Sequence, residues 1–213
     1  LVDRGVNVLR IGNPTRVNDK MLSFTYERRF EGHPAYSELW SIRKAMREIG
    51  GKHRGSYEER ESARNRMSRL RDRATQLEIQ INADLFDNAH VIASTLVSSN
   101  HRILNGRHFG TLFIDEAAQA LEAACWIAIR KADRVVLAGD HCQLPPTIKC
   151  YEAARGGLEC TLMERVVANK PSTVSLLKVQ YRMHEDIMKF PSQWFYNGEL
   201  QAAPEIRYRG ILD

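Results

Sequence analysis

The sequence has few cysteines, and their arrangement matches no known metal-ligand spacing. Its 213 residues contain only Cys125, Cys142, Cys150 and Cys160, and no two of them form a Cys-x-x-Cys pair. This spacing argues against a zinc site or a disulfide framework and favours free thiols in a reducing compartment. Long hydrophobic runs are also missing, since no apolar stretch approaches the roughly 18 residues of a membrane-spanning helix.

The start of the chain has no signal-peptide pattern, so we expect an intracellular, cytoplasmic protein, or a nuclear one in a eukaryote. The first residue is Leu1 rather than Met, and Leu1 to Gly5 resembles the end of a helix. The sequence therefore predicts a chain that begins inside a larger protein. Its 43% hydrophobic and 27% charged residues are ordinary for a globular domain and exclude a disordered or fibrous class.

The formal net charge of +5 is concentrated in the first half of the chain. Residues 1–110 contain 19 basic and 13 acidic side chains, whereas residues 111–213 contain 12 and 13. Seven arginines lie within twenty residues: Arg54, Arg60, Arg64, Arg66, Arg69, Arg71 and Arg73. Such a half would attract a polyanion such as nucleic acid, although a solvated helix face explains the same pattern.

Apolar residues at spacings of three and four predict two helices in residues 36–84. The first pattern is Leu39, Ile42, Met46 and Ile49, and the second is Ala63, Met67, Leu70, Ala74, Leu77 and Ile81. Gly50-Gly51 ends the first pattern, and the seven arginines all lie off the second apolar seam. We therefore expect an antiparallel helical hairpin with a packed seam.

Short apolar runs on either side of this hairpin predict β-strands. They cover residues 6–11, 90–95, 111–115, 134–140 and 174–180, and helical patterns such as 119–130 lie between them. This alternation predicts an α/β fold with a parallel sheet covered on both faces. Ligands of such sheets bind at the carboxyl ends of the strands, where this sequence places polar residues.

Three of these strand ends contain residues suited to phosphate chemistry. Asp115-Glu116 follows one strand, and paired carboxylates could hold Mg²⁺ and polarise a water molecule. Gln143 follows the next strand, where its amide could contact a γ-phosphate. Tyr181-Arg182 follows the last, with a ring that can stack and a guanidinium that can clamp phosphate. Two solvated acids, an incidental glutamine and a surface Tyr-Arg pair are the alternatives.

The amino-acid sequences of these motifs and their order along the chain resemble those of a known enzyme family. IDEAAQALE, AGDHCQLPP and VQYRMH are similar to motifs II, III and IV of the Upf1-like superfamily 1 helicases, and IGNPTR and VIASTLVSS are similar to that group's motifs Ib and Ic. The resemblance implies a RecA-like P-loop NTPase lobe with a parallel sheet and an inserted antiparallel helical hairpin, incomplete at both ends. It divides the chain into the start of lobe 1 (1–35), the hairpin insertion (36–84), the rest of lobe 1 (85–173), and the hinge with the start of lobe 2 (174–213).

The resemblance also implies residue roles. Asp115 would hold Mg²⁺, Glu116 would be the catalytic base, Gln143 would sense the γ-phosphate of ATP, Arg182 would act as an arginine finger and Tyr181 would stack on the base. Pro14, Arg16, Thr95 and Ser98 would lie along single-stranded DNA or RNA, for which Arg16 and Thr95 have an independent physical case as phosphate ligands. No membrane partner is expected.

The sequence contains no G-x-x-x-x-G-K-[ST] phosphate-binding loop, and Gly50-Gly51-Lys52-His53 fails this pattern. We therefore expect an ATP-dependent helicase or translocase as the parent protein, and a 213-residue chain that hydrolyses no ATP without the rest of its helicase core. A non-catalytic nucleic-acid-binding module is the main alternative. A nucleotide-dependent switch without a nucleic-acid role is the third, and salt-sensitive binding to single strands would count against it.

Overall fold

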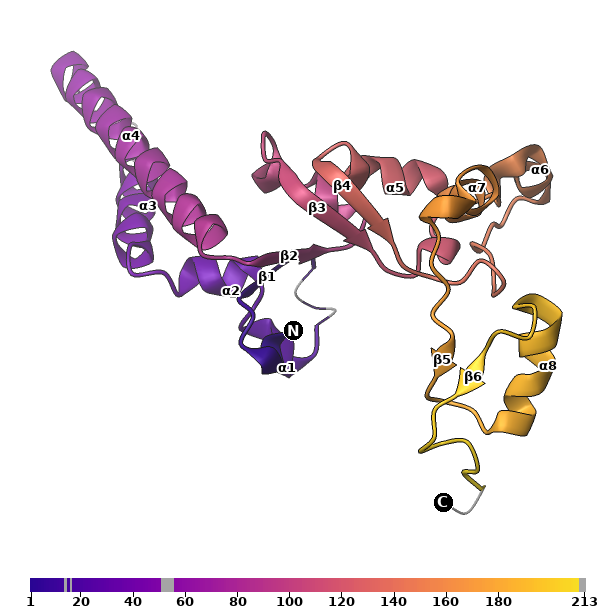
Figure 1. Ribbon diagram of the computed structural model, residues 1–213. Helices are drawn as coiled ribbons and strands as arrows, with labels where there is room; N and C mark the ends of the chain where they lie inside the picture. Colours follow the sequence, from indigo (N-terminus) through magenta and orange to yellow (C-terminus); the bar gives the residue numbers. More distant parts are fainter. Residues whose placement is uncertain (14, 16, 51–55, 211–213) are drawn as a thin grey trace. The chain divides into compact units, whose positions relative to one another are not determined.

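The computed structural model describes residues 1–13, 15, 17–50 and 56–210, and the chain divides into two units, 1–105 and 106–213 (Figure 1). The first unit contains η1 (Val2–Arg4), β1 (Val8–Ile11), α1 (Asp19–Leu22), α2 (Tyr26–Glu31), α3 (Tyr36–Gly50), α4 (Tyr57–Asp87), β2 (Val91–Ser94), η3 (Ser98–Asn100) and η4 (Arg102–Leu104). The second contains β3 (Phe109–Ile114), η5 (Ala117–Gln119), α5 (Glu122–Ile129), β4 (Ala132–Leu137), α6 (Tyr151–Ala153), η6 (Ala154–Leu158), α7 (Leu162–Asn169), η7 (Pro171–Thr173), β5 (Val179–Gln180), α8 (Glu185–Phe195) and β6 (Gln201–Ala202).

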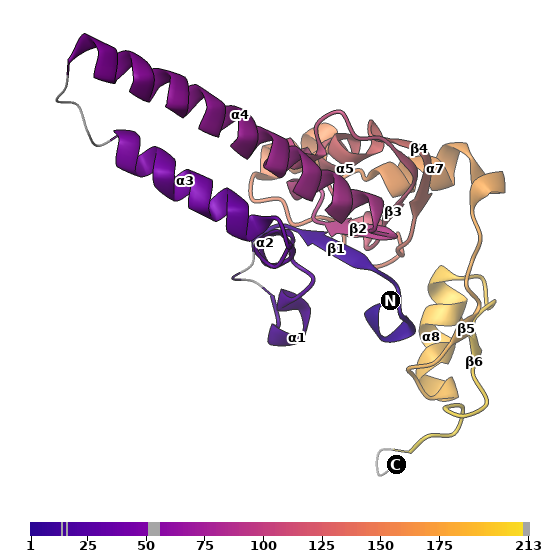
Figure 2. The same ribbon diagram turned by 90° about the vertical axis from the view of Figure 1, so that its left-hand side faces the viewer.

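Helices α3 and α4 form the predicted helical hairpin, and Figure 2 shows them side by side along their length. Their shared core is Leu39, Ala74, Leu77 and Ile81, all of which belong to the predicted apolar patterns. A capping box starts α4, since Ser56 Oγ accepts from the Glu59 amide and Glu59 Oε2 accepts from the Ser56 amide. The residues that join the two helices, 51–55, lie outside the described part of the chain.

The surface of α4 that contains the other six arginines is exposed, as the apolar pattern predicts, and Arg54 lies outside the described residues. Arg73 forms a bidentate ion pair with Glu38, and Arg43 pairs with Glu78 at 2.6 Å across the hairpin. These pairs join α3 to α4 around the apolar seam. The register of the hairpin is therefore set by buried apolar side chains and by ion pairs at its edges.

The strands pair in parallel, as the sequence predicts, but the described residues distribute them over three two-stranded sheets. These are β1 with β2, β3 with β4, and β5 with β6. Within the described residues of the second unit, α5 packs on the β3–β4 pair with the buried Cys125 and Ala128, and Phe113 of β3 is 73% exposed. Strand β5 is shorter than residues 174–180 because only Val179 and Gln180 find partners on β6.

Buried side chains support each unit separately. Val8, Leu9 and Ile11 of β1 are buried in the first unit, and Ile114 of β3 is buried in the second. No helix among the described residues is both long and apolar enough to cross a membrane.

Candidate functional site

The loops that follow β3 and β4 leave the same edge of one parallel sheet. Ile114 pairs with Leu137 at the ends of the two strands. Beyond them the Ala138 amide donates to Ile114 O, and the Ala117 amide donates to Ala138 O, both at 2.8 Å. The backbone segments at Asp115-Glu116 and at the start of the Gly139–Gln143 loop are therefore held next to each other by continuous backbone hydrogen bonds.

Gly139 allows this close approach of the two loops. A Cβ atom at this position would lie 3.0 Å from the Ala117 amide nitrogen, 3.1 Å from that of Ala118 and 3.2 Å from Met163 Sδ. Two of these three atoms belong to backbone, which cannot move aside as the end of a flexible side chain can. The glycine of the sequence motif is therefore required by packing.

Asp115 and Glu116 are both exposed where β3 ends. Asp115 Oδ1 accepts from the Glu116 amide at 3.1 Å, and Oδ2 has no hydrogen-bond partner among the described residues. Glu116 adopts the left-handed backbone conformation, with φ 52° and ψ 39°, and its Oε2 accepts from Gln119 Nε2 at 3.3 Å. Accessible carboxylate oxygens are the ligands that Mg²⁺ prefers, so Asp115 fits a magnesium-holding role.

Three donors converge on Asp140 in the loop after β4. The Cys142 amide donates to Oδ1 at 3.0 Å, Gln143 Nε2 donates to Oδ2 at 2.7 Å, and the Tyr196 hydroxyl also donates to Oδ2. Burial acts to raise the pKa of Asp140, but these hydrogen bonds together hold it below its ordinary value. The Asp140 carboxylate therefore stays ionised and organises the loop.

The neighbouring side chains of Asp140, His141 and Cys142 offer possible metal-ligand atoms within 4.8 Å of one another. Both oxygens of Asp140 already accept hydrogen bonds from protein donors, and the Cys142 thiol contacts the Phe195 carbonyl oxygen at 3.8 Å. Burial raises the pKa of the Cys142 thiol, which disfavours the thiolate that binds zinc. These contacts give no support for a metal site here.

Gln180 shapes the loop that contains Tyr181 and Arg182. Its Oε1 accepts from the amides of Arg182 (2.9 Å) and Met183 (2.8 Å), and its Nε2 donates to Met183 O at 2.7 Å. Tyr181 is 68% exposed, and Arg182 is exposed as well. Both side chains are therefore presented to solvent on a loop fixed from within.

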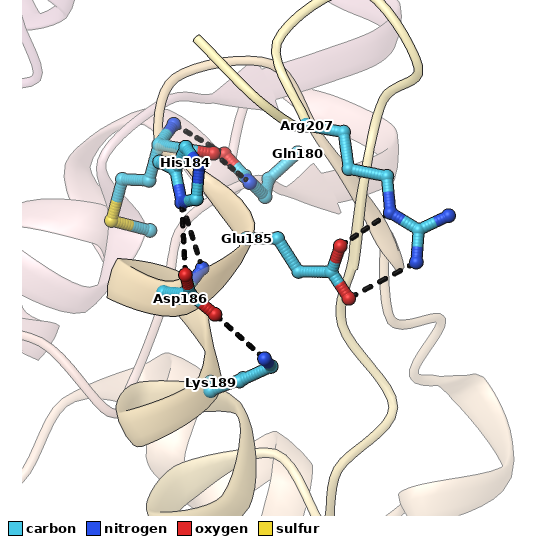
Figure 3. A network of polar contacts seen from close by, with 7 residues as sticks. Gln180, His184, Glu185, Asp186, Lys189 and Arg207 are labelled. Atoms are coloured by element: carbon cyan, nitrogen blue, oxygen red, sulfur yellow. Dashed lines mark hydrogen bonds and ion pairs between the residues drawn. The ribbon is translucent and has the colours of Figure 1, made fainter. Parts of the chain in front are cut away.

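Polar contacts also fix the start of α8 below this loop (Figure 3). His184 Nδ1 accepts from the Asp186 amide at 3.1 Å and caps the helix. Arg207 makes a bidentate ion pair with Glu185, which lowers the pKa of that carboxyl, and Lys189 donates to Asp186 at 2.6 Å. The loop at 181–183 therefore rests on an anchored helix.

The candidate nucleic-acid residues of the first unit lie beyond the paired ends of β1 and β2. Thr95 Oγ1 donates to Ser98 Oγ at 2.9 Å and accepts from the Ser98 amide at 3.2 Å. Ser98 Oγ also lies 3.5 Å from the position of a Cβ on Gly12, so the β1 end approaches the same hydroxyl pair. Pro14 and Arg16 lie outside the described residues.

The structure thus brings Asp115 and Glu116 beside the Gln143 loop, and it brings Thr95 and Ser98 together in the other unit. No hydrogen bond among the described residues joins Arg182 to Asp115 or Glu116. Sequence reasoning missed two residues, Tyr196 and Gln180. Gln180 lies inside the motif that was recognised, whereas no pattern around Tyr196 indicates its contact with Asp140.

Comparisons with known proteins cover nearly the whole chain. Two family models, each described as an AAA domain, match residues 2–150 and 158–211. DNA-binding protein SMUBP-2 of Mesocricetus auratus is 34% identical over 206 residues, 93% of this chain and 21% of that protein. DNA polymerase alpha-associated DNA helicase A of Saccharomyces cerevisiae is 33% identical over 223 residues, 97% of this chain and 32% of that protein.

An archaeal protein of Methanocaldococcus jannaschii, named as an uncharacterized ATP-dependent helicase, is 29% identical over 244 residues. That match covers 98% of this chain and 36% of the relative. The chain therefore spans between about a fifth and about a third of the length of the three relatives.

Proposed function

The chain belongs to the Upf1-like superfamily 1 helicases, and on this premise we propose that it contributes ATP-hydrolysing and nucleic-acid-contacting residues to a helicase or translocase. The resemblance of its motifs to that family is thereby confirmed. The proposed substrate is single-stranded DNA or RNA. The observation on which the proposal depends is the joint edge of β3 and β4, where Asp115-Glu116 and the Gln143 loop are held together by backbone hydrogen bonds.

The proposed chemistry at this edge is water attack on the γ-phosphate of ATP. Asp115 would hold Mg²⁺ through its free oxygen, since the other oxygen accepts from the Glu116 amide. Mg²⁺ supplies neutralisation of the charge on the triphosphate when it is bound. Glu116 would orient the attacking water and accept its proton, because its carboxylate is exposed directly after Asp115 and is oriented by the hydrogen bond from Gln119 Nε2.

Residues of two other loops complete the proposed nucleotide site. Gln143 would contact the γ-phosphate with its amide, and Arg182 would neutralise charge that develops in the transition state. Tyr181 would stack on or near the adenine base with its exposed ring. The contacts of Gln180 support this assignment, since they hold the Tyr181–Arg182 loop without using either side chain.

The nucleic-acid contacts would come from the ends of β1 and β2. The Thr95 hydroxyl donates to Ser98 Oγ, which leaves the Ser98 hydroxyl able to donate to a phosphate oxygen. Arg16 and Pro14, which lie outside the described residues, are further candidate contacts from the sequence. Contacts of this kind recognise the backbone rather than the base. They therefore predict binding to single strands of many sequences, and they do not distinguish DNA from RNA.

The test is a Glu116→Gln substitution in a helicase core that joins this chain to a phosphate-binding loop. We expect ATP hydrolysis to fall by at least about 100-fold, because the amide cannot accept the proton of water, while ATP affinity stays within about twofold. Glu159→Gln is the matched control, since Glu159 is exposed in the same unit and outside the proposed site. Hydrolysis near the parent rate in Glu116→Gln would refute the assignment of the base.

A nucleic-acid-binding module without chemistry is the second candidate, and the excess of basic side chains in residues 1–110 favours it. A module of this kind would bind a single-stranded oligonucleotide with strong salt dependence, yet would hydrolyse no ATP in the parent core or in any variant. An enzyme would show hydrolysis that the oligonucleotide stimulates. Measuring both properties of the same core therefore separates the two candidates.

A further inference from the structure

We propose that Tyr196 is a positioning residue that orients the Gln143 side chain through the Asp140 carboxylate, and so links helix α8 to the loop that contacts the γ-phosphate. The inference deepens the proposed function and rests on it. The structural basis is one oxygen atom, Asp140 Oδ2, which accepts from both the Tyr196 hydroxyl and Gln143 Nε2. The two donors come from chain segments more than fifty residues apart.

Tyr196 is well suited to hold this carboxylate, because its own backbone is fixed. It lies at the end of α8, where its amide donates to Ser192 O at 3.1 Å and its carbonyl accepts from the Glu199 amide at 2.9 Å. Ser192 is buried and its hydroxyl accepts from the Leu200 amide at 3.2 Å. The tyrosine ring therefore extends from a closed helix end rather than from a free loop.

A second contact joins the same two segments. The Cys142 thiol lies 3.8 Å from the carbonyl oxygen of Phe195, the residue before Tyr196. The Cys142 amide in turn donates to Asp140 Oδ1 at 3.0 Å. The loop after β4 is thus held to the end of α8 at two adjacent points, and the Asp140 carboxylate lies at the centre of this contact.

The hydroxyl of Tyr196 remains a donor over the whole physiological pH range. Burial raises its pKa, and the hydrogen bond to Asp140 and the negative charge of that carboxylate raise it further. Asp140 itself stays ionised because its pKa is lowered. The pair is therefore a charged hydrogen bond, which is stronger than one between neutral groups.

Gln143 is constrained on the nitrogen side of its amide. Its Nε2 donates to Asp140 Oδ2, and its side chain also interacts with the Tyr196 hydroxyl, which acts to lower the pKa of that hydroxyl. Its Oε1 has no hydrogen-bond partner among the described residues. The amide plane is thereby fixed, with the carbonyl oxygen available to accept from water. A shift of α8 that moves Tyr196 would move Asp140 and rotate this plane. By reciprocity, phosphate bound to Gln143 would favour one placement of α8.

The functional test compares Tyr196→Phe with the parent helicase core. Phenylalanine keeps the ring but removes the donor, so Gln143 loses its fixed orientation. We expect kcat for ATP hydrolysis to fall about tenfold, with the KM for ATP changed by less than about twofold. Tyr151→Phe is the matched control, because the Tyr151 hydroxyl has no hydrogen-bond partner among the described residues.

A double substitution tells positioning apart from a general structural role. If Tyr196 acts through Gln143, adding Tyr196→Phe to Gln143→Ala produces no further fall in kcat. An additional tenfold fall in the double variant would overturn the proposal, as would a parent-like kcat in Tyr196→Phe. If the parent core hydrolyses no ATP, the proposed function is wrong, and the positioning role of Tyr196, which rests on it, is wrong as well.

The contact itself can be tested in the 213-residue chain by its ultraviolet absorbance as pH rises. The wild-type and Tyr196→Phe titration curves should coincide until the chain unfolds, because Tyr196 does not ionise with the other tyrosines. Asp140→Asn should lower the pKa of Tyr196 relative to the wild type, because it removes the charge of Asp140 while the burial that also raises this pKa remains, and one extra tyrosine should therefore ionise before the chain unfolds. If Tyr196 already ionises near pH 10 in the wild type, its hydrogen bond to Asp140 is absent and the proposed positioning role is wrong, whatever the ATPase result.

Discussion

Replacing Gly139 with alanine should destabilise the second unit by a predictable amount. The added Cβ would meet the Ala117 and Ala118 nitrogens at 3.0 and 3.1 Å, so the two loops must separate by a few tenths of an ångström. That separation stretches the 2.8 Å hydrogen bond from the Ala117 amide to Ala138 O. Overpacking of this kind costs about 1–3 kcal/mol, and the lower entropy of the unfolded alanine chain returns about 0.4–1 kcal/mol.

The net loss of unfolding free energy is therefore about 1–2 kcal/mol. If this free energy falls by about 2–3 kcal/mol per molar urea, the midpoint of urea unfolding drops by roughly 0.5 M. Urea unfolding of the 213-residue chain, followed by tryptophan fluorescence, measures this loss. Gly110→Ala is the matched control, because it lies in β3 with nothing within 4 Å of the added Cβ. It should leave the midpoint unchanged or raise it. A Gly139→Ala midpoint equal to that of Gly110→Ala would refute the close-packing argument.

Two further predictions concern the hairpin core and the Asp140 carboxylate. Leu77→Ala should lower the free energy of unfolding by about 2–5 kcal/mol, because Leu77 is only 2% exposed. Ile79→Ala, at a position that is 64% exposed, should change it by less than about 0.5 kcal/mol. Unfolding followed by helical circular dichroism measures both values, and equal losses would contradict the assigned seam. The lowered pKa of Asp140 stabilises the fold above the ordinary pKa of aspartate, and this contribution is lost as the pH falls through the lowered value. Asp140→Asn should therefore be less stable than the wild type at about pH 6, and the difference in unfolding free energy between the two proteins should narrow toward about pH 3. Urea unfolding at both pH values measures this difference, and a difference that does not change with pH would show that the charge of Asp140 does not stabilise the fold.

The helices of the hairpin could be predicted because their signal is local. Leu39, Ala74, Leu77 and Ile81 repeat at helical spacing in the sequence, and the same four residues form the hairpin core. The positions of β1 to β4 were predictable for the same reason, and their parallel direction followed from the alternation of strands and helices. The grouping of strands into pairs was not, since β5 depends on a partner at Gln201–Ala202 whose short segment has no pattern of its own.

The candidate site could be predicted only as far as its motifs extend. Asp115, Glu116 and Gln143 follow strands, and the β3–β4 register places their loops side by side. The roles assigned to them, to Tyr181 and Arg182, and to the nucleic-acid residues stay predictions. Tyr196 could not be found in this way, because its hydrogen bond to Asp140 joins distant segments and depends on where α8 ends.

The left-handed backbone conformation of Glu116 affects how substitutions at this position change the stability of the fold. A side chain at φ 52° costs roughly 1–2 kcal/mol that glycine would not cost, so the fold alone would favour glycine at the position proposed for the catalytic base. The proposed role of Glu116 as the catalytic base would account for a carboxylate at this position despite the penalty. Glu116→Gly is therefore expected to gain stability while losing the proposed base, so a stability screen would enrich this inactive variant, whereas Glu116→Gln would keep the backbone penalty.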